Sequence, residues 1–276
     1  MRTQDIVRQL KLLPSYLRLS LLRTAEDKIQ LWGAFATSII SIVLYMFFWN
    51  VITYQIPVLT GVGWVVWGRA ELTFLIGVTE IAWGFGSFAY MGLWEVHWYI
   101  TEIGLEEFRI RPVSSIYQIF AQNFWAGGLL QVAIGGAMLF LSTITFGLVI
   151  IPINLVLGIF ALLIGQAALY ILWGCLCCLA FWIGRNQGLL EVSDAVEMNF
   201  ARMPIDIMPL GVQYFLTFIL PVIFISTIPT MIMLGQLPLG LILVYFVIAG
   251  VLVLVWSVVF RYLWAKGVKR YQPVGG

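Results

Sequence analysis

Side chains able to carry out catalysis are scarce in this sequence. His97 is the only histidine, so no histidine metal cluster can form, and its place beside Trp94 and Trp98 favours interfacial packing over catalysis. The three cysteines fall within residues 175–178 of an apolar run, which is typical of small buried side chains. The sequence contains no P-loop. We therefore expect no catalytic, cofactor-binding or metal-binding site in this chain, and any ATP would be bound by another subunit.

Three polar side chains within apolar segments are candidates for a translocation path. Glu71 lies near the expected outer end of a predicted span and Glu80 near its middle, where ionisable groups are costly enough to indicate function. Glu80 shares a helical face with Gly77 and Gly84, and Gln131 lies among the glycines of the next span. We predict that Glu80 and Gln131 line a cavity or subunit interface, with Glu80 attracting a cationic substrate. The alternative is hydrogen bonding within helix packing, which is favoured for Gln131.

A long polar interruption, residues 95–118, separates two apolar segments. Residues 95–124 hold four of the thirteen acidic residues, and apolar side chains alternate with acids on a short amphipathic piece. This pattern predicts a docking element for a soluble partner, although a solvated loop has the same composition. The docking residues would be Glu102, Ile103, Leu105, Glu106, Glu107, Phe108 and Arg109. A second polar interruption, residues 185–208, has the same two interpretations.

Composition indicates a lipid environment for most of the chain. Hydrophobic residues make up 62% and charged residues 10% of the 276 residues, whereas soluble domains average about 45–50% and about 25%. The mean hydropathy is +0.99. A net charge of +2 gives no electrostatic support for a nucleic-acid partner. The sequence predicts an all-α membrane protein with one transmembrane domain over residues 1–276.

Six apolar segments are long enough to cross a bilayer as helices. They lie at about residues 29–51, 69–94, 119–148, 155–183, 210–234 and 239–263. Residues 4–24 place basic and apolar side chains on opposite sides of a helix, which predicts an interfacial helix that does not cross. Pro221 and Pro229 are expected to break the fifth span.

Basic residues indicate the orientation of these spans. They gather in the N-terminal arm, in the two long polar interruptions and in the C-terminal tail. By the positive-inside rule, both termini and residues 95–118 and 185–208 are expected in the cytosol. A partner that binds the first polar interruption would therefore act from inside the cell.

Three segments in order along nearly the whole chain resemble one family of transport proteins. Residues 103–113 are similar to its Gly-x-x-Asp-x-x-Leu-x-Arg-Pro-Leu passage, with Glu107 where aspartate is usual. Pro221 and Pro229 resemble the two prolines of its fifth helix, and residues 267–271 resemble its tail. The chain thus resembles ABC-type export permeases of the ABC-two class, in the six-helix branch that is encoded apart from its ATPase and includes viologen exporter permeases.

The resemblance implies a permease subunit in a bacterial plasma (inner) membrane. It would pair with a second permease chain, identical or homologous, while cytosolic ATPases bind ATP and act on residues 95–118. A small hydrophobic or organic-cation molecule would be exported. The alternative is an ATP-independent secondary transporter or channel. A single carboxylate in the middle of the membrane gives only weak support for coupling transport to an ion. A membrane enzyme is disfavoured by the lone histidine, and a structural assembly partner is left open.

Overall fold

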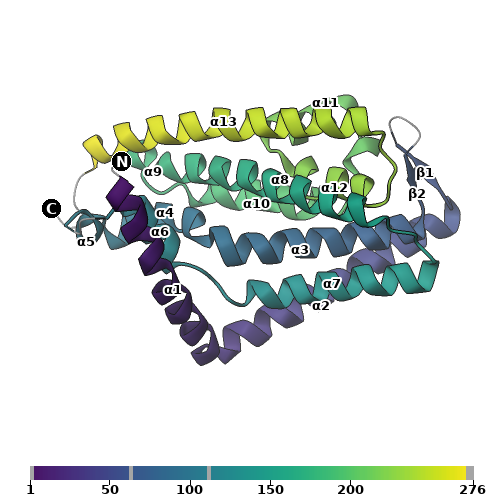
Figure 1. The fold of residues 1–276 in the computed structure, drawn as a ribbon, viewed down its shortest axis with the longest axis horizontal. Coiled ribbons are helices and arrows are strands. Elements are labelled where there is room, and N and C mark those ends of the chain that lie inside the picture. The colour runs from purple at the N-terminus through teal and green to yellow at the C-terminus, as the bar shows by residue number, and fades with distance from the viewer. Residues whose placement is uncertain (1–2, 62–64, 111–112, 272–276) are drawn as a thin grey trace.

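The computed structural model describes residues 3–61, 65–110 and 113–271, which are almost entirely helical (Figure 1). The helices are α1 (Thr3–Glu26), α2 (Lys28–Gln55), α3 (Arg69–Trp94), α4 (Val96–Trp98), α5 (Glu106–Arg109), α6 (Ser115–Gln122), α7 (Gly128–Phe146), α8 (Pro152–Cys178), α9 (Ala180–Ile183), α10 (Gln187–Phe200), α11 (Leu210–Tyr214), α12 (Thr227–Met233) and α13 (Leu239–Arg270). Short π or 3-10 turns lie at Tyr99–Ile103, Ile205–Ile207, Phe215–Ile219 and Val222–Ile225. Two short strands, β1 (Leu59–Thr60) and β2 (Val66–Trp67), pair antiparallel. The all-α prediction is confirmed.

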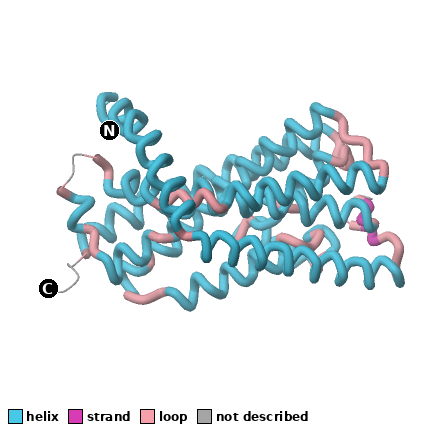
Figure 2. Tube along the Cα trace, turned by 90° about the horizontal axis from the view of Figure 1, so that it is seen from below, coloured by secondary structure: helices cyan, strands magenta, loops and turns pink. Residues whose placement is uncertain are grey.

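The long helices run side by side along the length of the molecule. Figure 1 places the strand pair at one end and α5, α6 and the last turns of α13 at the other. Figure 2 shows the same separation, with the strands opposite the start of α1. We call these two ends the hairpin end and the α5 end. The long helices connect the hairpin end with the α5 end.

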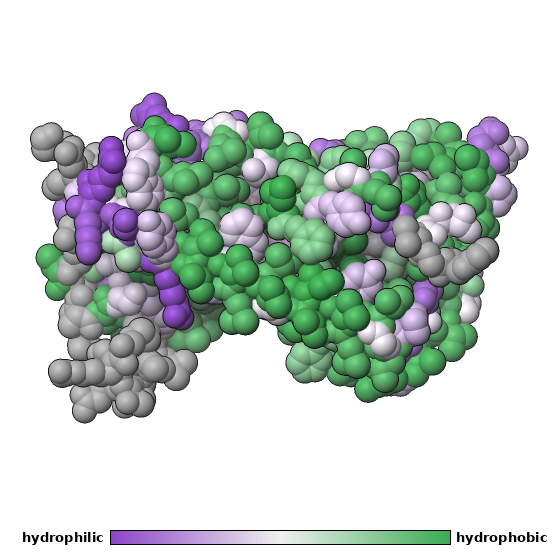
Figure 3. Space-filling view, turned by 90° about the horizontal axis from the view of Figure 1, so that it is seen from above, coloured by the Kyte–Doolittle hydropathy of each residue, from purple (hydrophilic) through white to green (hydrophobic). Residues whose placement is uncertain are grey.

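Apolar side chains cover the middle of the surface. In Figure 3, hydrophobic residues form a broad green region between hydrophilic residues that gather toward the two ends. Among the described residues, five helical segments are long and apolar enough to cross a membrane, or up to six if a bent pair counts as one span. On α13, for example, Leu243, Val247, Leu254 and Val258 are exposed. This arrangement is that of a multi-pass membrane protein.

Helix α3 is the central helix of the bundle, and it packs closely against α7 and α8. Glycines allow the contact with α7: a Cβ at Gly84 would lie 2.5 Å from the carbonyl oxygen of Gly128. A Cβ at Gly135 would lie 2.6 Å from the carbonyl oxygen of Gly77. The glycines that share a face with Glu80 on α3, and those of α7, therefore allow the two backbones to touch.

The predicted fifth span is broken at Pro221, as expected. Its two halves, Leu210–Ile219 and Val222–Met233, are bent by 76°. Both flanks of the segment lie at the hairpin end: Trp67 Nε1 donates to Asp206 before it, and Gln236 Nε2 donates to a β2 carbonyl after it. The segment therefore enters the bundle and returns to the same end, which differs from the single crossing expected from its hydropathy.

Residues 185–208 run beside α3 and α8 from one end of the molecule toward the other, with Leu190 and Glu197 as the buried residues of α10. At the α5 end, Arg185 Nε lies 2.9 Å from Glu102 Oε1. At the hairpin end, Trp67 Nε1 donates to Asp206 Oδ2 over 3.0 Å. The prediction of a cytosolic docking element or solvated loop did not anticipate this packing, because Glu197 of α10 accepts its hydrogen bonds from Trp83 on α3 and Trp173 on α8.

Candidate functional site

Residues 95–118 form a bent element at one end of the bundle. The chain continues from α3 through α4 and a π turn, and then turns at Gly104, where φ is +100°. This conformation strongly favours glycine, because a side chain there would be strained. The short helix α5 follows, and α6 begins at Ser115. We call residues 102–109 the elbow.

Two of the predicted docking residues anchor the elbow instead of facing outward. Leu105 is 1% exposed and Phe108 4% exposed, and both pack in the main apolar core. The predicted residues that are exposed are Glu102, Ile103 and Glu106. The side chains of Glu107 and Arg109 lie outside the described part of the structure. Among the elbow side chains that the structure describes, the outward ones are thus two carboxylates and one large apolar side chain.

Hydrogen bonds tie the elbow to other helices. Tyr271, at the end of α13, accepts a bond from the Leu105 N–H and donates one to Glu106 Oε1, both over 2.9 Å. Gln118 Nε2 on α6 donates to the Phe108 carbonyl over 3.0 Å. The ion pair between Glu102 and Arg185 joins the elbow to the residues just before α10. The elbow is therefore bonded to α6, to the end of α13 and to Arg185 just before α10.

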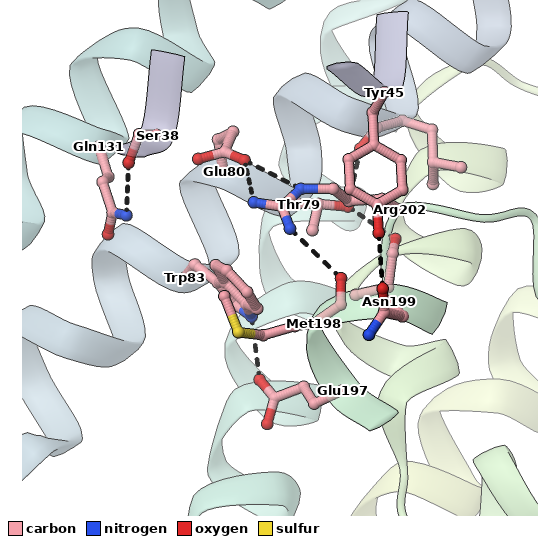
Figure 4. A network of polar contacts seen from close by, with 12 residues as sticks. Ser38, Tyr45, Thr79, Glu80, Trp83, Gln131, Glu197, Met198, Asn199 and Arg202 are labelled. Atoms are coloured by element: carbon pink, nitrogen blue, oxygen red, sulfur yellow. Dashed lines mark hydrogen bonds and ion pairs between the residues drawn. The ribbon is translucent and has the colours of Figure 1, made fainter. Parts of the chain in front are cut away.

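The charge of Glu80 is compensated by Arg202, which belongs to the second polar interruption, residues 185–208. Arg202 Nη2 lies 2.7 Å from Glu80 Oε1, and their side chains are 4% and 0% exposed. The guanidinium also lies over the ring of Trp83, 4.5 Å from its centroid, and over that of Tyr45 at 5.1 Å. Figure 4 shows this pair between α3 and the end of α10. Glu80 is thus held by the protein itself.

The structure does not bring the three predicted path residues together. Glu71 Oε2 accepts a bond from the Gly68 N–H over 2.9 Å and caps the start of α3. It precedes Glu80 by nine residues, which is about 13 Å along a helix. Gln131 Nε2 donates to Ser38 Oγ over 2.9 Å, so it joins α7 to α2.

Glu197 is a buried carboxylate that the sequence prediction assigned only to a polar interruption. Glu197 is 3% exposed. Trp83 Nε1 donates to Oε1 over 3.0 Å, and Trp173 Nε1 donates to Oε2 over 2.9 Å. A signal was present, because a tryptophan in the middle of a span needs an acceptor for its N–H group. The acceptor itself lies 114 residues from Trp83 in the chain.

Asp206 lies beyond α10 at the hairpin end and is 6% exposed. Its Oδ2 accepts the Trp67 bond, while Oδ1 has no partner among the described residues. Burial raises the pKa of Asp206 from 3.8 to about 6, and the Trp67 bond offsets part of that rise. The folded protein therefore binds a proton at Asp206 more tightly than the unfolded chain does.

This shift predicts a stability that depends on pH. An acid whose pKa is higher in the folded state stabilises the protein fully below its unfolded pKa, and that contribution is lost as pH rises through the folded value. Between pH 4 and 7 we expect a loss on the order of 2 kcal/mol in the free energy of unfolding. Asp206→Asn should remove most of this loss in unfolding experiments across that pH range. The exposed cap variant Asp27→Asn should keep it, and an unchanged pH profile for Asp206→Asn would contradict the assignment.

The described residues contain no group of three or more histidine, cysteine and acidic side chains able to hold a metal ion. Cys175, Cys177 and Cys178 are free and buried. His97 Nδ1 lies 2.9 Å from the Trp94 carbonyl, a contact within its own helix end.

Residues 39–275 match a family model described as "ABC-2 family transporter protein". The match includes α3 through α13 and therefore the elbow, the buried ion pair and the bent segment. No curated protein gives a significant match to the sequence. Permeases of this family are membrane components of ABC transporters, and their ATPase activity lies in a separate subunit. The chain belongs to the ABC-2 transporter family.

Proposed function

We propose that this permease subunit works in an ATP-driven exporter in which cytosolic ATPases act on the elbow. The observation that carries the proposal is the elbow itself. Its outer surface presents Glu102, Ile103 and Glu106, while Leu105 and Phe108 fix it in the core. A rigidly anchored element with an exposed acidic and apolar surface suits the transmission of force from a soluble partner.

The proposed topology has six crossings, formed by α2, α3, α7, α8, α10 and α13. Helix α10 replaces the bent segment as the fifth crossing, since residues 185–208 connect the two ends of α3. An even number of crossings leaves both termini and the elbow on one side of the plasma (inner) membrane. The basic residues of the N-terminal arm and the tail favour the cytosol for that side.

A second permease chain, identical or homologous, would complete the translocation path. The exposed face of α2 supports this pairing. Helix α2 buries only one narrow face, at Ser38, Ile42, Trp49 and Thr53. The large apolar side chains on its other faces include Ile40, Val43, Leu44, Phe47 and Val51, all exposed. The proposed substrate is a small hydrophobic or organic-cation molecule, which such a path can carry across the membrane.

Charge reversal on the elbow tests the proposal. The tagged chain is co-expressed with an ABC ATPase that binds it, and the retained ATPase is measured after purification. We expect the double variant Glu102→Lys and Glu106→Lys to retain at least about tenfold less ATPase, because juxtaposed like charges cost several kcal/mol. ATP-dependent transport should fall in parallel.

A matched control is Glu26→Lys, which reverses an exposed carboxylate at the end of α1, away from the elbow. This variant should retain the ATPase at the wild-type level. Melting temperatures of all variants report whether the bundle is intact. Wild-type retention by the double variant would refute the docking assignment. ATP-independent flux by the purified chain alone in liposomes would favour the secondary transporter or channel.

A further inference from the structure

A cavity of about 650 Å³ lies at the corner where α1 meets α2, and we call it the corner cavity. Figure 1 shows this corner at the edge of the bundle, where α1 turns away from α2. The lining comes from the end of α1, the start of α2, the end of α3 and residues 122–125. The Ser20 hydroxyl donates to the Phe124 carbonyl and so joins two of these walls. The volume is in the range of sites that bind organic molecules, about 300–1,000 Å³.

The first turns of α2 stand away from the rest of the bundle. All buried residues of α2 lie at Ser38 or beyond it, and none of residues 28–37 is buried. A Cβ at Gly33, which lines the corner cavity, would meet no atom within 4 Å. A molecule in the cavity would therefore fill space that the described helices leave open between the start of α2 and the end of α3.

Ionisable side chains of both signs line the corner cavity. Arg23 lies in the last turn of α1, Asp27 lies between α1 and α2, and Glu95 follows α3. Arg23 and Asp27 are exposed, and Glu95 is half-buried. Among the described residues, none of the three forms an ion pair. Asp27 Oδ1 accepts the capping bond from the Gln30 N–H over 3.0 Å. The lining thus offers a guanidinium and two carboxyl groups to a ligand that carries both an anion and a cation.

The corner cavity loses its charged lining toward the middle of the bundle. Glu95 directly follows α3, whereas Ser87 lies eight residues earlier, which is about 12 Å along a helix. Ala34, Ser87 and Met91 line the cavity at positions further into α2 and α3, and they carry no charge. The polar layer on each side of a bilayer is about 5–7 Å thick. With the end of α3 in that layer, the cavity reaches into the hydrocarbon layer.

Exposed apolar side chains flank the corner cavity on both helices of the corner. They are Leu19 and Leu22 on α1, and Ile29 and Trp32 on α2. Tryptophan is enriched where a membrane meets water. A lipid whose headgroup occupies the cavity can extend its acyl chains over these side chains. One such molecule therefore matches both the charged lining and the apolar flanks.

We propose that the corner cavity binds the headgroup of one phospholipid of the phosphatidylethanolamine class. The phosphate pairs with Arg23, because a guanidinium binds two phosphate oxygens at once. The primary ammonium has three N–H donors for Asp27 and Glu95. An anionic headgroup without an amine would bring its charge close to these two acids with no cation to offset it. The bound lipid connects α1 and the start of α2 to α3.

Lipid binding to the delipidated full chain in detergent micelles tests the proposal. Native mass spectrometry measures the Kd of the first lipid bound, with phosphatidylethanolamine and phosphatidylglycerol of identical acyl chains as probes. We expect phosphatidylethanolamine to bind at least about tenfold more tightly, because only its headgroup donates charged hydrogen bonds to the acids. Glycerophosphoethanolamine, the soluble headgroup without acyl chains, should not displace the lipid at equal concentration. Displacement would identify a soluble zwitterion as the ligand and overturn the lipid assignment.

Two variants separate the contributions of the ammonium and the phosphate. Glu95→Gln should raise the Kd for phosphatidylethanolamine at least about tenfold without weakening phosphatidylglycerol binding. Arg23→Gln should weaken the binding of both lipids, since both carry a phosphate. Arg23 is exposed, so this variant keeps the proposal testable even if Glu95→Gln disturbs folding.

Glu26→Gln and Lys28→Gln are the matched controls. Both residues are exposed beside Asp27 in the chain, and neither lines the corner cavity. These variants should bind phosphatidylethanolamine as the wild type does. Equal affinity of the wild type for the two lipids would overturn the proposal, and so would wild-type binding by both Glu95→Gln and Arg23→Gln.

Discussion

Replacing Arg202 by methionine is expected to lower the free energy of unfolding by about 3–5 kcal/mol, because removal of one partner strands a buried charge. Glu80 is 0% exposed, and its only charged partner in the described structure is Arg202. Its Oε2 already lacks a hydrogen-bond partner among the described residues. The change also removes the contact of the guanidinium with Trp83. Reversible unfolding in mixed micelles, followed by tryptophan fluorescence, measures the loss.

The double variant Glu80→Met with Arg202→Met is the informative control. A buried ion pair replaced by apolar side chains of similar volume is often neutral or stabilising. We therefore expect the double variant to be more stable than the single Arg202→Met variant. If the single variant is no less stable than the double, Glu80 does not depend on Arg202 for its charge. The pair would then have no role in holding α10 against α3.

Hydropathy predicted most of the bundle, since α2, α3, α7, α8 and α13 are long apolar segments in a chain with few charges. Hydropathy could not predict that α10 packs beside α3 and α8. The acids Asp194 and Glu197 make this helix polar when it is read alone. Its contacts with the bundle depend on Trp83, Trp173 and Glu80, which are separated from it by many residues. A single-sequence window has no access to such pairings, so the sequence predicts a span at the next apolar segment, residues 210–234, and none at α10.

The elbow was located from sequence, but its orientation was not. The polar pattern of residues 95–118 and the family resemblance marked the segment. Which side chains face outward depends on the turn at Gly104 and on the bonds from Tyr271. The sequence shows that residue 104 is a glycine, but it does not show that this glycine adopts a positive φ. Leu105 and Phe108 therefore belonged to the predicted contact surface, although the structure uses them as anchors.

Replacing Gly135 by alanine is expected to separate α3 from α7. The new Cβ would lie 2.6 Å from the Gly77 carbonyl oxygen and 2.8 Å from the Ile81 nitrogen. Backbone atoms cannot rotate away as a side chain would, so the two helices must move apart. We expect a loss of about 1–3 kcal/mol in the free energy of unfolding, the usual cost of overpacking. Thermal unfolding of the purified chain measures it.

Gly136→Ala provides a matched control on the adjacent residue of α7. A Cβ at Gly136 meets nothing within 4 Å. Alanine favours the helix over glycine by about 1 kcal/mol, so this variant should be as stable as wild type or more stable. Equal destabilisation by both substitutions would mean that α7 tolerates no side chain for another reason. Opposite effects of the same methyl group, one residue apart, would show that close backbone contact with α3 holds α7 in place.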